Sequence, residues 1–503
     1  MTLTSFSFFE FLLVTVLLFY LIRPIQKYIL LVASIYFYIG VSSVSNSKLL
    51  ALMLGIWSVT YFGAIVIDKT SGKIRSLCLI ICVMSLLTSL FTLKYAYNIV
   101  NVITGLLKIE HDFAWLQFAA IIGISYYALS AVGYLIDVYW QNYSATRNPV
   151  DIALFIFYFP QLISGPFTRF SSMKEQFNKK MNLDYNNITY GMRRMAWGYF
   201  KKLVISERFG VVVTHIYGDY NSYSMVGIVG ATLCYAVQLY TDFSGCMDII
   251  MGASKLFGID LPENFSAPFF SETIQEFWQR WHITLGLWFK DYVMYPVQKS
   301  KTIQKIGKYG KRKFGKRIGK KIAFYTAMLL LWILIGIWHG GTGYYFIASA
   351  GIPCILLILS DIMQPVFKGI VSTLKINTEC TSWHVFRRIR TLLLICICWI
   401  VACSGGTHTA VSIIKHMLIN PINYTAFTVA IDAFGLNTLD ILIMAVGIVV
   451  IYVAHRLEYM GTSIIKKMDE QNLIFRISLI YVEVMMIFIH GMVGSSSFIY
   501  FQF

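Results

Sequence analysis

Long runs of apolar residues, separated by short polar segments, dominate the chain. A helix crosses the hydrocarbon core of a bilayer with about 20 mostly apolar residues, and many of the runs are suited to this. The pattern predicts about ten to twelve spans, the number depending on the region between 150 and 295. The runs that read most clearly as spans are 5–22, 28–45, 49–67, 76–94, 113–136, 322–338, 343–363, 391–403 with its flanks, 439–455 and 476–493.

The middle third, 151–300, breaks this pattern with short apolar runs rich in Pro and Gly and interrupted by polar residues. Irregular backbone at membrane depth is tolerated only where protein or water covers it, so this region is expected to line a cavity. Residues 272–295 have helical periodicity, with the charged and aromatic side chains in separate sectors. They predict one amphipathic, aromatic helix at the membrane interface, with His282 on its apolar side.

Composition supports a membrane protein that fills 1–503 as a single domain. Of the 503 residues, 57% are hydrophobic and 13% are charged, whereas an average soluble domain has roughly 25% charged residues. The first apolar run leads directly into Arg23 and Lys27, which predicts a retained helix and not a cleaved signal peptide. The nine cysteines predict neither a disulfide framework nor a metal site.

The net charge of +17 is concentrated in residues 299–321, which contain eleven Lys or Arg and no acidic residue. Positive loops between spans are typical of the cytoplasmic side, so we expect a solvated cytoplasmic loop and both chain termini outside. Binding of phosphate, on anionic membrane lipid or on an acyl-CoA donor, is the alternative for this loop. A nucleic-acid partner is not expected.

Ionisable residues within membrane segments are costly, so each is a candidate for function. His339 stands between Trp338 and two glycines at the end of an expected span, and His282 stands in the aromatic stretch 277–282. Imidazole has a pKa suited to taking a proton from a hydroxyl near neutral pH. A buried structural histidine is the alternative for each position.

Six segments then appear in order along the chain: Tyr158–Pro166, Tyr240–Gly245, Leu261–Phe265, Phe277–Leu285, Trp288–Tyr292 and Gly336–Gly340. Together, between about 125 and 350, they resemble the membrane-bound O-acyltransferase family. The resemblance is to the bacterial branch that holds the alginate O-acetyltransferase membrane subunit and the D-alanyl transfer protein of teichoic acid synthesis.

The resemblance implies an all-α ring of helices around a thinned central tunnel, with His339 as the active-site residue and His282 as a second polar group. It implies no bound cofactor and an acyl thioester donor, such as acetyl-CoA, that approaches from the cytoplasm. Other residues in the matching segments are expected to line the tunnel or bind substrate: Gln161, Asp242, Asn264, Arg280, Trp281, Asp291 and Trp338. For Asp242, Asn264, Arg280 and Asp291, helix–helix hydrogen bonding or an Arg–carboxylate pair is the alternative.

The chain ends in an aromatic motif, 498–503, that directly follows the last expected span. Its spacing of Phe498, Tyr500 and Phe503 is similar to the ending of the small companion protein in the D-alanyl system, where the tyrosine is thought to carry the acyl group. A phenol has a pKa of about 10 and leaves an ester more readily than an alkoxide, so Tyr500 is a candidate acyl carrier. An aromatic anchor at the outer interface is the alternative.

These features together predict a cell-membrane enzyme that moves an acetyl group across the membrane for O-acetylation of a cell-envelope or secreted polysaccharide. The resemblance implies an extracytoplasmic partner with a Ser-His-Asp site. D-alanyl transfer to teichoic acid is the nearest alternative, and a transporter or flippase without chemistry is the alternative from another class.

Overall fold

The computed structural model of the protein describes residues 1–42, 46–107, 123–340, 343–422, 434–492 and 498–499, and most of these residues are helical. Within these ranges extended backbone pairs at one isolated bridge, between Phe265 and Trp281. Eight of the described helices are long and apolar enough to cross a membrane. The prediction of an all-α, multi-pass membrane protein is confirmed.

Most candidate spans coincide with runs that the hydrophobic pattern predicts. They are Arg23–Val41, Ser47–Lys69, Gly72–Tyr97, Met225–Lys255, Lys301–His339, Gly343–Thr373, Thr438–Tyr459 and Leu473–His490. The span Met225–Lys255 lies in the region where the pattern gave no clear boundaries. The expected span at 391–403 belongs to a described helix, Thr381–Cys403, that is not among the eight. The ring of helices and its central tunnel stay predictions.

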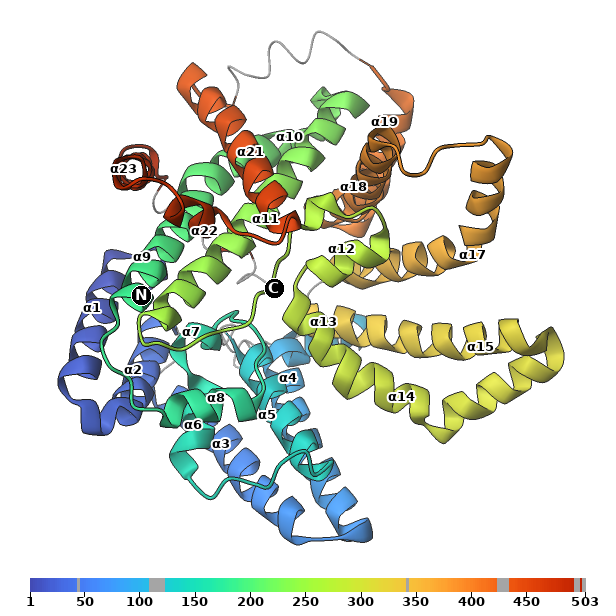
Figure 1. Ribbon diagram of the computed structural model, residues 1–503. Helices are drawn as coiled ribbons and strands as arrows, with labels where there is room; N and C mark the ends of the chain where they lie inside the picture. The colour runs from blue at the N-terminus through green and yellow to red at the C-terminus, as the bar shows by residue number, and fades with distance from the viewer. Residues whose placement is uncertain (43–45, 108–122, 341–342, 423–433, 493–497, 500–503) are drawn as a thin grey trace. The chain divides into compact units, whose positions relative to one another are not determined.

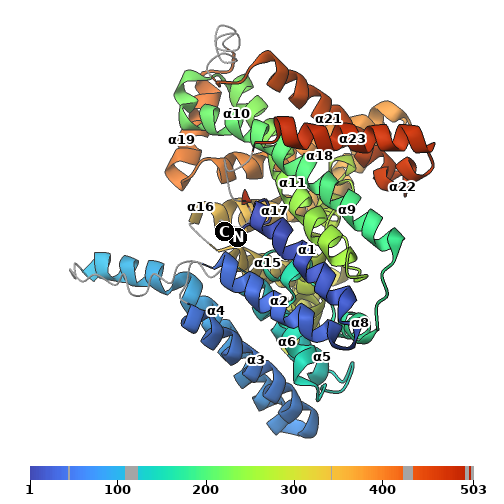
Figure 2. The ribbon, with the colours of Figure 1, turned by 90° about the vertical axis from the view of Figure 1, so that its left-hand side faces the viewer.

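The contacts divide the described residues into two compact units, and each is considered by itself. The first unit comprises Met1–Ala196 with Cys246–Pro262. In Figure 2 the long helices α3 and α4 of this unit lie side by side. Its helices are α1 (Phe6–Leu21), η1 (Arg23–Ile25), α2 (Gln26–Val41), α3 (Asn46–Lys69), α4 (Gly72–Leu107), α5 (Ile124–Tyr139), α6 (Pro149–Phe157), α7 (Phe159–Leu162), α8 (Phe170–Asn178) and most of α9 (Tyr185–Tyr199).

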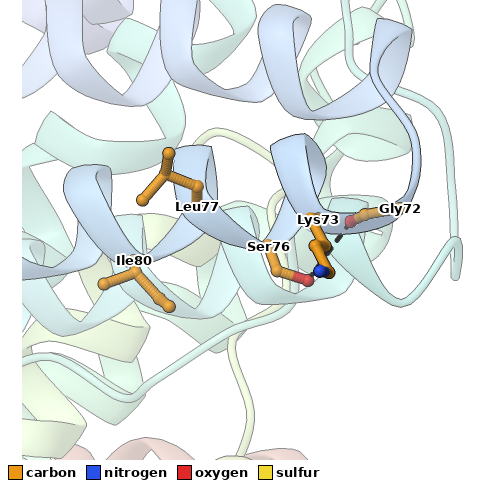
Figure 3. A pocket seen from close by; sticks show the side chains of 5 residues that line it. All are labelled: Gly72, Lys73, Ser76, Leu77 and Ile80. Carbon is orange, nitrogen blue, oxygen red and sulfur yellow. Dashed lines mark hydrogen bonds between the residues drawn. The ribbon is translucent and has the colours of Figure 1, made fainter.

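One hollow of the first unit lies beside the start of α4 (Figure 3). A single helix supplies its lining, which consists of Gly72, Lys73, Ser76, Leu77 and Ile80. None of these is a candidate site residue. The Ser76 hydroxyl is 2.9 Å from the Tyr139 hydroxyl, so it joins α4 to α5.

The second unit comprises Trp197–Gly245 with Glu263–Ile499. It contains both candidate histidines. Its helices are η3 (Phe200–Ser206), α10 (Glu207–Gly218), η4 (Tyr220–Ser222), much of α11 (Met225–Lys255), η5 (Pro268–Phe270), α12 (Ile274–Arg280), α13 (Ile283–Phe289), η6 (Lys290–Met294), α14 (Tyr295–Lys299), α15 (Lys301–His339), α16 (Gly343–Phe346), η7 (Ile347–Gly351), α17 (Ile352–Thr373), α18 (Thr381–Cys403), α19 (Thr407–Ile419), α21 (Thr438–Tyr459), α22 (Ile464–Asp469) and α23 (Leu473–His490).

The basic segment 299–321 is a pair of helical arms, so the expectation of a loop is wrong in its structure. Gly315, with φ 85° and ψ 164°, interrupts α15, and Figure 1 shows the chain doubling back there. The arms meet at glycines: a Cβ on Gly319 would lie 2.2 Å from the backbone nitrogen of Lys311. Lysine and arginine are good helix formers, and glycine permits the left-handed turn and the close approach, which explains the hairpin.

Candidate active site

The expected continuous helix over 272–295 is broken at His282, and this prediction is wrong. Helix α12 ends at Arg280 and α13 begins at Ile283, as the two short helices in Figure 1 show. Between them His282 has φ 49° and ψ 51°, the left-handed conformation that costs an L-residue about 1–2 kcal/mol. Such strain is found where the surrounding structure enforces it, commonly at functional sites.

Asn264 supplies the interactions that enforce this break. Its backbone carbonyl accepts from the Ile283 N–H at 3.0 Å, and its side-chain oxygen accepts from the Thr284 N–H at 3.1 Å. The Thr284 hydroxyl donates to the same oxygen at 2.6 Å. The segments 261–265 and 277–285, which stand apart in the sequence, therefore fold together, and Asn264 satisfies the first amides of α13 that lack helical partners.

Asn264 also determines which nitrogen of His282 carries the proton. A backbone N–H only donates, so the side-chain atom that accepts from Thr284 must be the oxygen of Asn264. This oxygen lies 3.4 Å from Nδ1 of His282 and can only accept there. Neutral His282 consequently has its proton on Nδ1 and its lone pair on Nε2.

The surroundings of His282 keep its ring neutral. The residue is 5% exposed, and the ring of Phe243 packs edge-on against it with centroids 4.9 Å apart. Burial holds the pKa of His282 well below its usual 6.5, and the neighbouring His339 lowers it further. A neutral imidazole with its lone pair on Nε2 accepts a hydrogen bond or a proton from a ligand.

His339 reaches the same place from the end of α15. Gly340, with φ 77°, ends this helix directly after the histidine. The ring of Trp338 lies 4.9 Å from the ring of His339 and 6.2 Å from that of His282, and Tyr345 lies 6.1 Å from His339 on the other side of the turn in the chain. The structure thus brings His282, Trp338 and His339 together.

The close approach of α15 to α16 positions Trp338 and His339 at the end of α15. A Cβ on Gly336 would lie 2.6 Å from the ring of Phe346, so only glycine lets α15 pack this tightly against α16. The predicted motif 336–340 therefore has a packing role at its first residue and chemical groups at Trp338 and His339.

Two other predicted residues, Arg280 and Trp281, lie at the end of α12 and stabilise the break between α12 and α13. Arg280 pairs with Glu276 at 3.0 Å, donates to the carbonyl oxygen of Ser266 at 3.0 Å and lies over the ring of Tyr459. Trp281 is 8% exposed and stacks on Phe277 with ring centroids 5.6 Å apart. The contacts of Arg280 include the Arg–carboxylate pair that its residue type predicts.

Asp242 lies on α11, next to Phe243, and is fully buried. Its carboxylate is 2.7 Å from the ammonium of Lys202, which also pairs with Glu207. Sequence reasoning did not include Lys202 or Glu207. The three charges in the apolar stretch 199–207, which are Lys201, Lys202 and Glu207, are the signal that identifies them, because charges in such surroundings are rarely without a function.

The remaining predicted residues lie elsewhere or are not described. Asp291 is half-buried in η6. Gln161 belongs to the first unit, where its amide donates to the hydroxyl of Thr168 at 2.9 Å. Tyr500, the predicted acyl carrier, lies outside the described residues. Among the residues that are described, no cluster of three or more His, Cys, Asp or Glu side chains has the arrangement of a metal site.

The part of the chain that contains Asn264 and His282 is similar in sequence to known proteins. Residues 140–309, which include Asn264 and His282, match the membrane-bound O-acyltransferase family. The chain is 34% identical to the probable alginate O-acetylase AlgI of Pseudomonas syringae pv. tomato, over 58% of this chain and 50% of that protein. It is 31% identical to the peptidoglycan O-acetyltransferase of Helicobacter pylori, over 63% of this chain and 61% of that protein.

A third relative is the teichoic acid D-alanyltransferase of Bacillus subtilis, which is 29% identical over 45% of this chain and 55% of that protein. The chain thus spans about half the length of the alginate and teichoic acid relatives. The motifs, the multi-pass helical fold and these matches agree. Over residues 140–309 the chain is similar to the membrane-bound O-acyltransferase family, and the similarity to the alginate and peptidoglycan O-acetylating relatives extends over 58% and 63% of the chain.

Proposed function

We propose that the chain is a membrane O-acyltransferase that moves acetyl groups from a cytoplasmic thioester across the membrane, for O-acetylation of a cell-envelope or secreted polysaccharide. The observation that carries the proposal is the group formed by the buried His282 and Trp338 with the half-buried His339, in which Asn264 holds His282 as a neutral acceptor. The names of the relatives support the class of acceptor, because two of them are a probable alginate O-acetylase and a peptidoglycan O-acetyltransferase.

In the proposed step His339 takes the proton of the attacking hydroxyl as the oxygen forms a bond to the acyl carbonyl carbon. The carbon–sulfur bond then breaks, and the thiolate of the donor leaves and receives that proton. Positioned general bases contribute about 10²–10⁴-fold to such reactions. His282 holds a hydroxyl through the lone pair on its Nε2, which is an orienting role and not a charged one.

The first hydroxyl in this proposal is the phenol of Tyr500. The resulting tyrosyl ester has a leaving group with a pKa of about 10, so a serine of an extracytoplasmic partner with a Ser-His-Asp site can take the acyl group and restore the phenol. The partner then passes the acyl group to the polysaccharide. The donor is acetyl-CoA or another acyl thioester, and the enzyme itself holds no cofactor.

The proposal requires one orientation in the cell membrane. The two basic arms of α15 face the cytoplasm and the termini lie outside, in agreement with the positive-inside rule. Single cysteines at exposed arm positions such as Lys311 are expected to resist impermeant thiol reagents in intact cells and to react after permeabilisation. Rapid labelling in intact cells would mean that the arms lie outside and that the donor and acceptor sides are the reverse of those proposed.

The donor is tested with membranes that contain the chain and a labelled acetyl or D-alanyl thioester. Asp440→Asn is a suitable control, because it alters a partly buried ion pair, with Arg208 at 2.9 Å, that touches neither histidine. We expect acetyl transfer by the parent and by this control. Transfer of D-alanine alone would assign the chain to teichoic acid modification. Transport of a solute without any acyl transfer would contradict the proposal that the chain is an acyltransferase.

A further inference from the structure

Three charged side chains are buried together where η3, α10 and α11 meet. The Lys202 ammonium lies 2.5 Å from Glu207 and 2.7 Å from Asp242, and the three side chains are 2%, 8% and 0% exposed. The cluster contains one cation and two anions. Buried carboxylates require hydrogen bonds or opposite charges for their oxygens.

Ile499, near the C-terminus, provides one of these hydrogen bonds. The backbone N–H of Ile499 donates to Oδ2 of Asp242 at 2.9 Å, across 257 residues of sequence. The preceding residue, Phe498, is 2% exposed, and the ammonium of Lys202 lies 4.8 Å from the centre of its ring. A cation over an aromatic face is attracted by the ring quadrupole, and the attraction is stronger when both are desolvated.

Helix η3, which is a π-helix, also contacts the chain before Phe498. The N–H of Met492, two residues after α23, donates to the carbonyl oxygen of Leu203 in η3 at 3.0 Å. π-Helical turns are uncommon and are frequent at functional sites. Consecutive residues of η3, Lys202 and Leu203, therefore contact the C-terminal segment at both Phe498 and Met492.

The cluster is also adjacent to the histidine site. Asp242, which binds Ile499, is followed on α11 by Phe243, whose ring contacts His282. Tyr500 is the residue after Ile499 in the chain. Two consecutive residues of one helix thus contact the end of the chain and the candidate active site.

We propose that Glu207, Lys202 and Asp242 form a receptor that holds Phe498 and Ile499, the described residues of the C-terminal segment, and that acyl transfer depends on this contact. The receptor function follows from the contacts alone, and its contribution to acyl transfer rests on the proposed function. Asp242 and Lys202 are then positioning residues for the carrier and have no part in the chemical step.

Docking is tested without an activity assay by placing a cysteine at Ile499 of the full-length protein. Ile499→Cys keeps the backbone donor, and the unsubstituted protein gives the background from the native cysteines. Adding Asp242→Asn leaves Lys202 and Glu207 as a balanced pair but removes the charge that holds the tail. We expect labelling of the introduced thiol to become about tenfold faster, as for loss of one charge-assisted hydrogen bond, and to stay unchanged when Asp440→Asn is added instead.

The contribution to transfer is tested by Ile499→Pro against Ile499→Ala. Proline has no N–H and cannot donate to Asp242, whereas alanine can. We expect acyl transfer by the proline variant to fall about tenfold below that of the alanine variant, the effect of one charge-assisted hydrogen bond. Phe498→Leu, which removes the ring over Lys202, is expected to speed labelling of the Ile499→Cys thiol as well.

Unchanged labelling of the Ile499→Cys thiol in both the Asp242→Asn and the Phe498→Leu backgrounds would overturn the receptor. Faster labelling with equal transfer by Ile499→Pro and Ile499→Ala would overturn its role in transfer. If the parent transfers no acyl group to any acceptor, the proposed function fails, while the labelling rates still decide whether the tail is docked.

Discussion

The second unit contains two sites in which polar side chains are stabilised in different ways. In the histidine site, His282 is neutral, and a single amide oxygen of Asn264 orders it through hydrogen bonds. The receptor for the C-terminal segment is ionic, with one ammonium shared by two carboxylates. The two sites share no charge, although Asp242 and Phe243 are neighbours in the chain.

The difference reflects what each site has to do. His282 must be uncharged to accept a hydrogen bond from a hydroxyl through Nε2, and its burial, which disfavours imidazolium, maintains that state. A site that holds a peptide amide gains from a full charge, because hydrogen bonds to ionised acceptors are about twice as strong as neutral ones. We infer that one site is built for proton transfer and the other for retention of a segment.

The largest effect is expected at Tyr500, the proposed acyl carrier. Tyr500→Phe keeps the ring and removes only the oxygen that would carry the acyl group, so we expect it to be as inactive as truncation after Ser497. Mass spectrometry of the C-terminal peptide, with the downstream partner deleted, should show an added acyl mass on Tyr500 of the parent.

Normal transfer by Tyr500→Phe, with an unmodified tail in the parent, would remove the tyrosyl intermediate. The C-terminal segment would then be an anchor, and His339 would act directly on the final acceptor.

A smaller loss is expected from disturbing the neutral site at Asn264. Asn264→Ala removes the acceptor that fixes the Nδ1 proton of His282, and loss of groups that orient a functional histidine typically reduces activity by about 10–100-fold. Asn264→Asp restores an acceptor but adds a negative charge, which raises the pKa of His282.

For Asn264→Asp we therefore expect partial recovery of transfer, with the loss of activity in acid displaced to higher pH. The measurement is the rate of transfer against pH for the parent and both variants. A purely structural role for Asn264 predicts reduced amounts of folded protein and an unchanged pH profile.

The smallest effect is on stability. The pKa of His282 is lower in the folded protein than in the unfolded chain, so the unfolded state takes up the extra proton as the pH falls below about 6.5. This destabilises the folded protein in acid. Gln cannot be protonated, so the melting temperature of His282→Gln in detergent should fall less than that of the parent between pH 7.5 and about 5.5. An equal fall would mean that His282 is already charged when folded.

The sequence predicts the chemistry of the site better than its shape. His282 and His339 stand out because ionisable groups are rare in apolar segments, and Trp338 is their neighbour in the chain. The helix break at His282 is not visible in the local pattern, because the aromatic periodicity of 272–295 fits a helix and the opposing hydrogen bonds come from Asn264. Long-range polar contacts override local periodicity there, as expected where function competes with regular structure.

The receptor was missed for a related reason. Lys202 and Glu207 are unusual in their apolar stretch, but their link to Ile499 joins residues that are far apart in sequence. The charge density of the basic segment 299–321 predicts a loop. In the structure the segment is a helical hairpin, because lysine and arginine favour helix and Gly315 permits the turn.

The most direct test of the proposed chemistry is acyl transfer from a labelled acetyl thioester by membranes that contain the parent, His339→Ala or the Asp440→Asn control at equal amounts of folded protein. We expect the control to match the parent and His339→Ala to lose at least about 10²–10⁴-fold of the transfer, the contribution of a positioned general base. Transfer by His339→Ala at a rate near that of the parent would contradict the assignment of the histidine site.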